Sequence, residues 1–365
     1  MERILREARK RELKHPNYNA IGYANIKIIG CGGAGNNTIN RLMKIGIMGA
    51  QCIALNTDHQ HLEMVEAHKK ILIGKNLTRG LGAGGNPEIG RAAAEESREE
   101  LKSILRESDL VFITCGEGGG TGTGSAPIVA EIAKLEGAIV VGVVTLPFNT
   151  EVGRIDIAQR GLENLKQFVD TLVVIDNNRL LDIAPDLPIL EAFSVADEVL
   201  STMVKGITET ISLPSLINLD FADVRTILGT GGVAIVGIGE SNGNENRVEE
   251  AIRDALNTPL LDVSIEGAKG ALIHVCGGND MTLSEANSVA NKIYEKMDVN
   301  DSMVIWGARV SEEFDGFLRV MLLITGIHSP QIFGKTQSIN QVNNSSNIPR
   351  QKLNLSDDLF DIGEI

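Results

Sequence analysis

Residues 109–127 read DLVFITCGEGGGTGTGSAP, an apolar run followed at once by a loop in which glycine fills six of the last thirteen positions. The apolar run predicts a buried strand. Ser125 and Pro127 are residue types suited to the start of a helix. Consecutive backbone N–H groups that carry no side chains can surround phosphate oxygens, and a helix N-terminus adds a favourable dipole. The stretch therefore predicts an anion-binding loop between a strand and a helix.

Two other glycine clusters repeat this pattern. GCGGAGNN, from Gly30 to Asn37, follows the apolar run IKIIG and precedes a predicted helix, and GLGAGGNP, residues 80–87, precedes another. Three such loops favour a nucleoside triphosphate over a dinucleotide as ligand. The chain contains no GxxxxGK[ST] motif, so no P-loop lysine is available for the β- and γ-phosphates. Backbone dipoles and a metal ion must then meet the phosphate charge.

The first of these loops also fits a second ligand class. Gly30, Gly32 and Gly35 have the G-x-G-x-x-G spacing of dinucleotide-binding loops, and the next predicted strand leads to Asp58, which could hold a ribose. On these residues alone, an NAD- or FAD-dependent oxidoreductase is an alternative function.

The arrangement of apolar runs predicts the fold class. From Asn25 to about residue 180, short Val/Ile-rich runs alternate with helical segments, among them a charged helix over 87–108, which is typical of a parallel sheet covered on both faces. We therefore expect a doubly wound α/β domain. Apolar residues spaced three and four apart predict a long central helix over 189–212, followed by a smaller α+β domain with a mixed sheet.

Bulk composition excludes several classes of protein. The 365 residues include 34 Lys and Arg against 48 Asp and Glu, a net charge of −14, which argues against a nucleic-acid partner. The four cysteines are scattered without CxxC spacing and are expected to be buried thiols in a reducing cytoplasm. No secretory signal is present, and no run approaches the roughly 20 apolar residues of a membrane span, so direct membrane insertion is not expected.

The end of the chain changes in composition. Nine of the twelve residues in TQSINQVNNSSN, 336–347, are Asn, Gln or Ser, a composition that cannot bury a core. The terminal DDLFDIGEI, 357–365, mixes apolar and acidic residues as a short partner-binding motif does. A frayed tail is the alternative.

The motifs GGGTGTG, GCGGAGNN, GLGAGGNP, VVTLPF and NLDFADV occur in an order that resembles the FtsZ family of the tubulin superfamily, its archaeal members most closely, from about Asn25 to Ile327. The resemblance implies a tubulin/FtsZ-like fold, GTP or GDP with Mg²⁺ as ligands, and head-to-tail assembly with further copies of the chain. The expected parts are a charged N-terminal extension (1–24), a GTP-binding α/β domain (25–188), the central helix (189–212), an activating loop with the C-terminal α+β domain (213–328), a disordered linker (329–354) and a C-terminal interaction peptide (355–365).

The resemblance also implies a nucleotide site. Its expected phosphate-binding residues are Gly32, Gly33, Ala34, Gly35, Asn36, Asn37, Gly119, Gly120, Thr121, Gly122 and Thr123. Ala83, Gly84 and Gly85 would sense the γ-phosphate, and Asn56 and Asp58 would lie near the phosphates, with Asp58 as a possible ligand of Mg²⁺. Glu151 and Arg154 resemble the ribose and phosphate contacts. Glu117 stands where the family usually has an apolar residue, and we expect its side chain to point away from the phosphates, toward a stacked neighbour.

The resemblance also implies that guanine is recognised by Asn177, Phe193 and Asp197. Phe193 and Asp197 are four residues apart on one helix face, so the ring can stack on the base while the carboxylate accepts from its N1–H and 2-amino groups.

Asp220 and Asp223 are three apart and would share one face of a helical turn. By itself, this pattern favours a helix cap at Asp220 and a solvated acid at Asp223 over a catalytic pair. The resemblance implies that both carboxylates activate water at the γ-phosphate of a neighbouring subunit, with Asn218 supporting the loop.

These residues lead to one main hypothesis, a cytoplasmic GTPase of the mid-cell division ring that polymerises with GTP and hydrolyses it between subunits. Its expected partners are further copies of itself and, through the C-terminal peptide, a membrane-tether or regulatory division protein. A filament-forming paralogue that hydrolyses GTP weakly is an alternative, distinguished by whether light scattering with GTP decays as phosphate is released.

Overall fold

The apolar run that precedes the glycine-rich loop forms β4 (Leu110–Gly116), a buried strand between β1 and β5 in the parallel part of the sheet. The structure is a computed structural model that describes residues 24–179, 188–212, 217, 219–243, 246–257, 267–297 and 302–327. The expected linker and terminal peptide (329–365), and residues 1–23 of the N-terminal extension, lie outside the described residues, so the expected domain boundaries stay predictions.

Strand and helix alternate through the first half of the chain. The strands run in the order β3-β2-β1-β4-β5-β6 and all pair in parallel, so helices connect them across both faces. The elements are β1 (Ile26–Cys31), α2 (Gly32–Ile45), β2 (Ala50–Asn56), α3 (His59–Met64), β3 (Lys69–Leu72), α4 (Lys75–Thr78), α5 (Pro87–Glu96), α6 (Arg98–Leu105), β4, α7 (Thr121–Leu135), β5 (Ile139–Leu146), α8 (Val152–Lys166) and β6 (Thr171–Asp176).

The second half continues the same sheet. Within the described residues, ten strands form one sheet, because β7 pairs in parallel with β6, and the order then runs β7-β10-β8-β9 with β10 antiparallel to both of its neighbours. The elements are α10 (Ile189–Ser212), α11 (Phe221–Gly229), β7 (Val233–Ser241), α12 (Arg247–Asn257), β8 (Gly270–Gly277), α13 (Leu283–Tyr294), β9 (Met303–Val310), η1 (Glu312–Phe314) and β10 (Leu318–Ile327). The expected fold class is confirmed, and the mixed sheet extends the parallel one.

Two predicted helices differ in their bounds. The charged segment 87–108 is not one helix, because Ser97 separates α5 from α6 with φ −99° and ψ 11°, and its hydroxyl accepts a hydrogen bond from the Gly74 amide. The helix after the glycine-rich loop begins at Thr121, earlier than Ser125 and Pro127 suggest. Part of the glycine-rich loop is therefore itself the first turn of α7.

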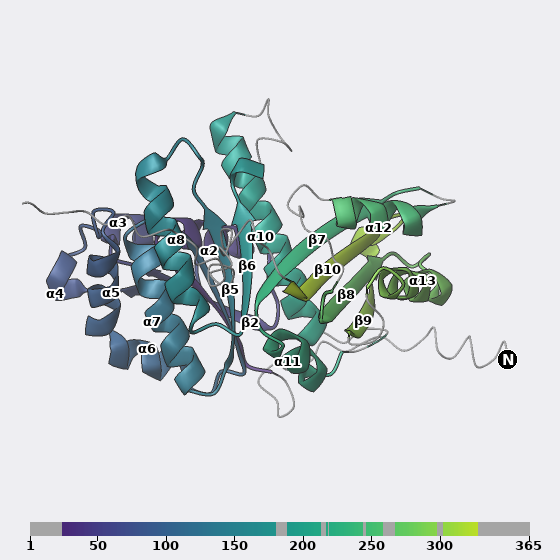
Figure 1. Cartoon of the computed structure of the whole chain (residues 1–365), viewed down its shortest axis with the longest axis horizontal. Helices are drawn as coiled ribbons and strands as arrows, with labels where there is room; N and C mark the ends of the chain where they lie inside the picture. The colour runs from purple at the N-terminus through teal and green to yellow at the C-terminus, as the bar shows by residue number, and fades with distance from the viewer. Residues whose placement is uncertain are drawn as a thin grey trace, which may run out of the picture. The chain divides into compact units, whose positions relative to one another are not determined.

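Helix α10 lies between the parallel strands and the β7–β10 part of the sheet (Figure 1). Its predicted apolar face is buried, with Leu200, Met203, Val204 and Ile207 no more than 2% exposed. Its 24 residues span about 36 Å at the usual rise of an α-helix. None of the described helices is both long enough and apolar enough to cross a membrane.

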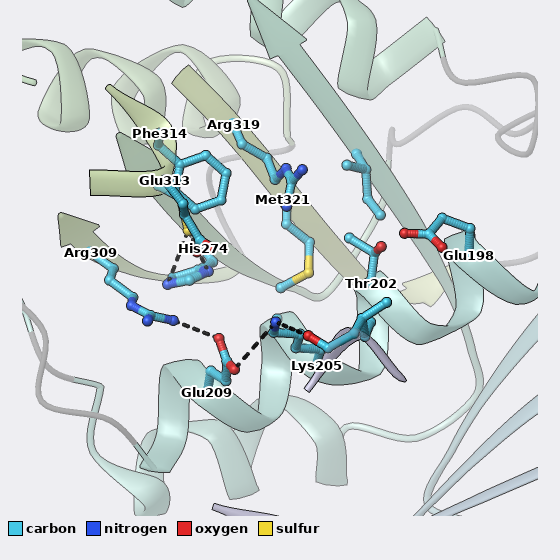
Figure 2. A pocket seen from close by; sticks show the side chains of 14 residues that line it. Glu198, Thr202, Lys205, Glu209, His274, Arg309, Glu313, Phe314, Arg319 and Met321 are labelled. Atoms are coloured by element: carbon cyan, nitrogen blue, oxygen red, sulfur yellow. Dashed lines mark hydrogen bonds and ion pairs between the residues drawn. The ribbon is translucent and has the colours of Figure 1, made fainter. Parts of the chain in front are cut away.

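A charged contact joins α10 to β9 beside a cavity of about 250 Å³ (Figure 2). Glu209 of α10 is 6% exposed, and its Oε2 accepts from Nη1 of Arg309 at 2.5 Å. Its Oε1 lies 3.8 Å from Nζ of Lys205, which also donates to the Ile45 carbonyl. Glu209 thus joins α10 to β9, and Lys205 beside it joins α10 to the end of α2.

We expect Glu209→Ala to lower the free energy of unfolding by about 3–5 kcal/mol, because it leaves the Arg309 guanidinium largely buried without its anionic partner. Chemical denaturation measures this change. Glu312→Ala is the control, since Glu312 is exposed in η1 and its loss is expected to change the stability by no more than about 0.5 kcal/mol. Equal effects of the two substitutions would contradict the assigned role of Glu209.

Candidate functional site

Two glycine loops meet where the strand order reverses. β1 lies between β2 and β4, so the loops that follow β1 and β4 leave the same edge of the sheet side by side. In open α/β sheets this switch point is where ligands bind. Helices α2 and α7 begin here. In neither helix does a side chain of the N-cap residue accept a hydrogen bond from the N–H groups of the first turn. Their first N–H groups are therefore available to an anion from outside the chain.

Glycine is required where these loops touch. A Cβ on Gly32, whose φ is +71°, would lie 2.7 Å from the Gly122 amide nitrogen, and one on Gly122 would lie 3.0 Å from the Cys31 carbonyl oxygen. A Cβ on Gly35 would lie 2.2 Å from the carbonyl oxygen of Thr114. Side chains at these positions would force α2 away from β4 and α7.

The third glycine cluster joins the same site. A Cβ on Gly120 would lie 2.8 Å from the Asn86 amide nitrogen and 3.0 Å from Cβ of Ala83. Asn86 itself caps α5, accepting from the Glu88 amide at 3.0 Å. The structure therefore brings together all three glycine clusters that the sequence singles out.

Some of the glycines have no packing reason to be glycine. A Cβ on Gly33, Gly84 or Gly85 would meet no atom within 4 Å, and one on Gly119 would meet only the Gly116 carbonyl oxygen at 3.8 Å. Gly84 and Gly85 have φ of +58° and +75°, which favours glycine on backbone grounds. Gly33 and Gly119 lack that reason. Their bare backbone fits a ligand that approaches closely, as phosphate groups do in such loops.

Hydroxyl and amide groups surround the loops. The Thr57 and Thr121 hydroxyls lie 2.6 Å apart, which links the end of β2 to the start of α7. Asn56 is buried, and its Oδ1 accepts from the Thr57 amide. Oδ1 of Asn36 accepts from the Leu55 amide, whereas its buried Nδ2 has no partner among the described residues. Asn37 and Ala34 of the same helix turn are exposed. The unpaired Nδ2 of Asn36 is a donor available for a bound ligand.

Asp58 has a structural partner already. Its Oδ1 accepts from the His61 amide at 3.1 Å and caps α3. Nowhere in the described ranges do three or more His, Cys, Asp or Glu side chains gather as a metal ion would require. A divalent cation here would depend chiefly on oxygens of a bound ligand, with Asp58 as one protein group beside it.

Residues expected at the ribose and phosphate lie at the start of α8, and Asn177, expected at the guanine base, follows β6. Glu151 and Arg154 form an ion pair of 2.8 Å, and a Cβ on Gly118 would meet Cβ of Arg154 at 2.9 Å. Arg154 therefore adjoins the β4 loop. Asn177 is 9% exposed, and its buried Oδ1 has no partner among the described residues.

Asp197 lies on α10 against α2. The Thr38 hydroxyl is 3.5 Å from Oδ1 of Asp197, and burial raises the pKa of this carboxyl to about 6, opposed by Thr38 and Arg41. Phe193 belongs to α10, but its side chain is outside what the structure describes.

The expected catalytic carboxylates lie at the other edge of the sheet. Asp220 caps α11 through the Ala222 amide, and both Asp220 and Asp223 are exposed. The Leu228 carbonyl of α11 accepts a hydrogen bond from the hydroxyl of Thr171, which is the first residue of β6. Helix α11 therefore lies where the parallel strands begin, whereas the glycine loops follow the last residues of β1 and β4. The strands between the two edges are six to eight residues long, about 20 Å. Asn218 lies outside the described residues.

Sequence reasoning missed two features of the site. The Thr57–Thr121 contact joins residues far apart in the chain, and only the strand order brings them together. Glu117 does point into the protein, away from the loop surface, but it is 4% exposed and cannot face a stacked neighbour as expected. Its carboxyl group occupies the space that Gly161 of α8 leaves open.

Comparisons with known proteins agree with this geometry. Residues 25–185 match the sequence profile of the Tubulin/FtsZ family, GTPase domain, and residues 232–328 match that of the FtsZ family, C-terminal domain. The cell division protein FtsZ 2 of Methanocaldococcus jannaschii is 58% identical over 316 residues, 86% of this chain and 83% of that protein. FtsZ 2 of Haloferax volcanii is 52% identical over 342 residues, 92% of this chain and 85% of that protein.

Solved structures give the same result. A structure described as an empty FtsZ dimer from M. jannaschii superposes with a TM-score of 0.81 at 50% identity, covering 95% of this chain and 98% of that one. CetZ1 from H. volcanii, described as a GDP-bound monomer, superposes with a TM-score of 0.73 at 23% identity over 85% of this chain and 96% of that one, which is a likeness of fold.

We expect Gly35→Ala to destabilise the protein by about 1–3 kcal/mol or more, because the added methyl group would overlap the Thr114 carbonyl. Gly33→Ala is the matched control in the same helix turn. Its methyl group meets open space, so the free energy of unfolding is expected to stay within about 1 kcal/mol of the original. Thermal and chemical unfolding compare the two. If Gly33→Ala is as destabilising as Gly35→Ala, the assignment of Gly33 to a ligand surface is wrong.

Proposed function

The chain belongs to the Tubulin/FtsZ family, and from that premise we infer that it is a GTPase which forms cell-division filaments. The observation that carries this conclusion is the convergence of three glycine loops at one edge of the sheet, with two exposed carboxylates at the other edge. The dinucleotide alternative rests on Gly30, Gly32 and Gly35 alone, and membership of this family leaves it without support.

We propose that the phosphates of GTP or GDP lie between the first turns of α2 and α7. Gly33 and Gly119 would let the phosphate oxygens approach the backbone, and Gly84 and Gly85 would lie against the γ-phosphate. The uncapped N–H groups of both helices supply the positive ends of two dipoles, which take the place of a P-loop lysine.

The donor set at this edge fits a Mg²⁺ ion held mainly through the phosphates. Asp58 and Asn56 would be the protein groups beside it, in keeping with the preference of Mg²⁺ for oxygen ligands and for retained waters. When bound, Mg²⁺ would neutralise phosphate charge. The chain's own residues keep the loops closed around that position, chiefly through the Thr57–Thr121 contact.

Guanine would be recognised beside α10. Asp197 is placed on the face of α10 that contacts α2, and its carboxylate accepts two hydrogen bonds from guanine that adenine cannot donate. Asn177 offers a buried Oδ1 in need of a donor. Phe193, one helical turn before Asp197, would stack on the base.

Catalysis requires a second copy of the chain. Asp220 and Asp223 cannot reach the glycine loops of their own chain, because they lie at the opposite edge of the sheet. Head-to-tail stacking would place them, supported by Asn218, at the γ-phosphate bound by the next subunit, where the carboxylates orient the attacking water. Phosphoryl transfer depends mainly on such positioning, so hydrolysis would follow assembly.

We expect Asp223→Ala to leave GTP binding unchanged and to lower the turnover of GTP by at least about 100-fold, since it removes a group that acts only in the transition state. Phosphate release and calorimetric GTP titration measure the two quantities. Asp254→Ala is the control, because Asp254 is an exposed acid of α12 that accepts from the Glu240 amide of β7 and belongs neither to α11 nor to the proposed nucleotide site. Unchanged turnover in Asp223→Ala would refute the role of this residue.

A mixing experiment separates catalysis between subunits from catalysis within one. Asp223→Ala retains its nucleotide site. Asp197→Asn retains the carboxylates of Asp220 and Asp223 but should no longer bind guanine. In an equal mixture, about a quarter of the head-to-tail contacts would pair an intact nucleotide site with intact carboxylates. Turnover should therefore reappear in the mixture, and its absence would contradict a shared site.

Light scattering of the unmodified protein with GTP distinguishes the weakly hydrolysing alternative. Scattering that does not decay as phosphate is released would favour that alternative.

The C-terminal peptide is proposed to bind a membrane-tether or regulatory division protein, and the protein to act in the cytoplasm at a mid-cell ring. The support is the return of apolar and acidic residues in DDLFDIGEI after the polar stretch 336–347.

Deleting residues 355–365 should leave GTP-dependent scattering and turnover unchanged, because no residue of the proposed nucleotide site lies there. In cells, a fluorescent fusion of the truncated chain should no longer gather at the division site, whereas the full-length fusion should. Retained localisation would contradict a tethering role for the peptide.

A further inference from the structure

Glu117 is a buried acid in the glycine-rich loop between β4 and α7. It follows the last residue of β4, and its backbone amide donates to the Thr145 carbonyl of β5 at 2.9 Å. The side chain is directed toward α8, where a Cβ on Gly161 would lie 2.2 Å from Oε2 of Glu117. Glycine at position 161 thus makes room for this carboxyl group.

The carboxyl group has few partners. Oε1 accepts from Sγ of Cys115 at 3.7 Å, and Oε2 has no partner among the described residues. Burial raises the pKa of Glu117 to about 7, although the Thr123 hydroxyl and Cys115 lower it. A buried carboxylate without a cation is costly, so the group is poised between its neutral and ionised forms.

No cation lies against this carboxyl group in the described structure. Cys31 of β1 and Cys115 of β4 are the titratable groups that face it, and burial raises the pKa of both thiols, to about 12 for Cys31. Helix α8 contributes two arginines to this region. Arg154 pairs with Glu151, and Arg160 is exposed and donates to the Asp156 carbonyl.

Glu117 is linked directly to the proposed phosphate loop. Thr123, in the first turn of α7, accepts from the Gly118 amide at 2.9 Å, and its Cγ2 lies 2.4 Å from the position that a Cβ on Gly161 would take. Thr123 and the Glu117 carboxyl group therefore share one small space behind the loop. A phosphate group bound on the open side of the loop brings negative charge close to this site, where the low dielectric strengthens the repulsion.

We propose that the Glu117 carboxyl group takes up a proton from solvent when the phosphates of a guanine nucleotide bind to the adjacent loop. The proposal rests on the proposed nucleotide site. Because the bound anion makes ionisation of Glu117 less favourable, the nucleotide-bound protein holds this proton to higher pH than the free protein does. Nucleotide affinity is then constant at low pH and falls as the pH rises between the two ionisation midpoints, by up to about tenfold per pH unit.

Calorimetric titration of the full chain with Mg²⁺ and GDP, which is not hydrolysed, tests this. At each pH from 6.5 to 8, the observed enthalpy is measured in buffers of different ionisation enthalpy, and the slope gives the protons taken up. Glu117→Gln keeps the shape of the side chain but cannot ionise. Near pH 7 the unmodified protein should take up a larger fraction of a proton than Glu117→Gln, and its Kd for GDP should rise more steeply with pH.

The nucleotide phosphate and Asp197 also titrate in this range, but both are present in the unmodified protein and in Glu117→Gln. The difference in proton uptake between these two proteins therefore belongs to Glu117. Glu131→Gln is the matched control, since Glu131 is a half-buried glutamate of helix α7, which follows the loop that carries Glu117, and it pairs with Arg98. It should behave as the unmodified protein does. Equal proton uptake by all three proteins would overturn the proposal while leaving the nucleotide site intact, and a folded protein that binds no GDP would overturn both.

If Glu117→Gln does not fold, infrared difference spectra of the unmodified protein decide the question. With ¹³C-labelled glutamate, addition of GDP at pH 7.5 should increase the absorption of protonated glutamate carboxyl groups. No increase would overturn the proposal.

Discussion

The close approach of two backbones, at Gly32 and Gly122, is the constraint on which the site depends. The first turns of α2 and α7, which follow neighbouring strands, come within van der Waals contact here, and a side chain at either position would prevent it. Once they do, uncapped N–H groups of α2 and α7 point into one region. The phosphate site that we propose is therefore built mainly from main-chain N–H groups, without the lysine that other phosphate loops employ.

This economy has a consequence for catalysis. Backbone dipoles can hold a phosphate, but they cannot orient a water molecule for attack, and the acids suited to that task lie at the far edge of the sheet. In the function that we propose, each end of the chain therefore supplies one part of a shared active site. Such a division would keep a lone subunit from hydrolysing its nucleotide and would make turnover depend on assembly.

The sequence predicted the parts of the structure that depend on local pattern. These parts depend on residues that are close together in the chain, and they are the alternating apolar runs and helices, the three glycine loops and the long helix α10. Features set by long-range packing were less accessible. Ser97 divides a helix because its hydroxyl accepts a hydrogen bond from the amide of Gly74, 23 residues earlier in the chain. The two predicted sheets form a single sheet because β7 pairs with β6. Glu117 was expected at the surface because nothing in its own loop reveals that Gly161 leaves a space for it.

The join between the two parts of the sheet is narrow. Only Leu172 with Val233 and Val173 with Ala234 are paired between β6 and β7, whereas β10 is in register with eight residues on each of its neighbours. A relative rotation of the two parts would therefore break few backbone hydrogen bonds, and its cost would fall mainly on the apolar core that α10 and α11 share with both parts. Resistance to bending at this join thus comes from side-chain packing, which is not directional, more than from the main-chain hydrogen bonds that stiffen the rest of the sheet.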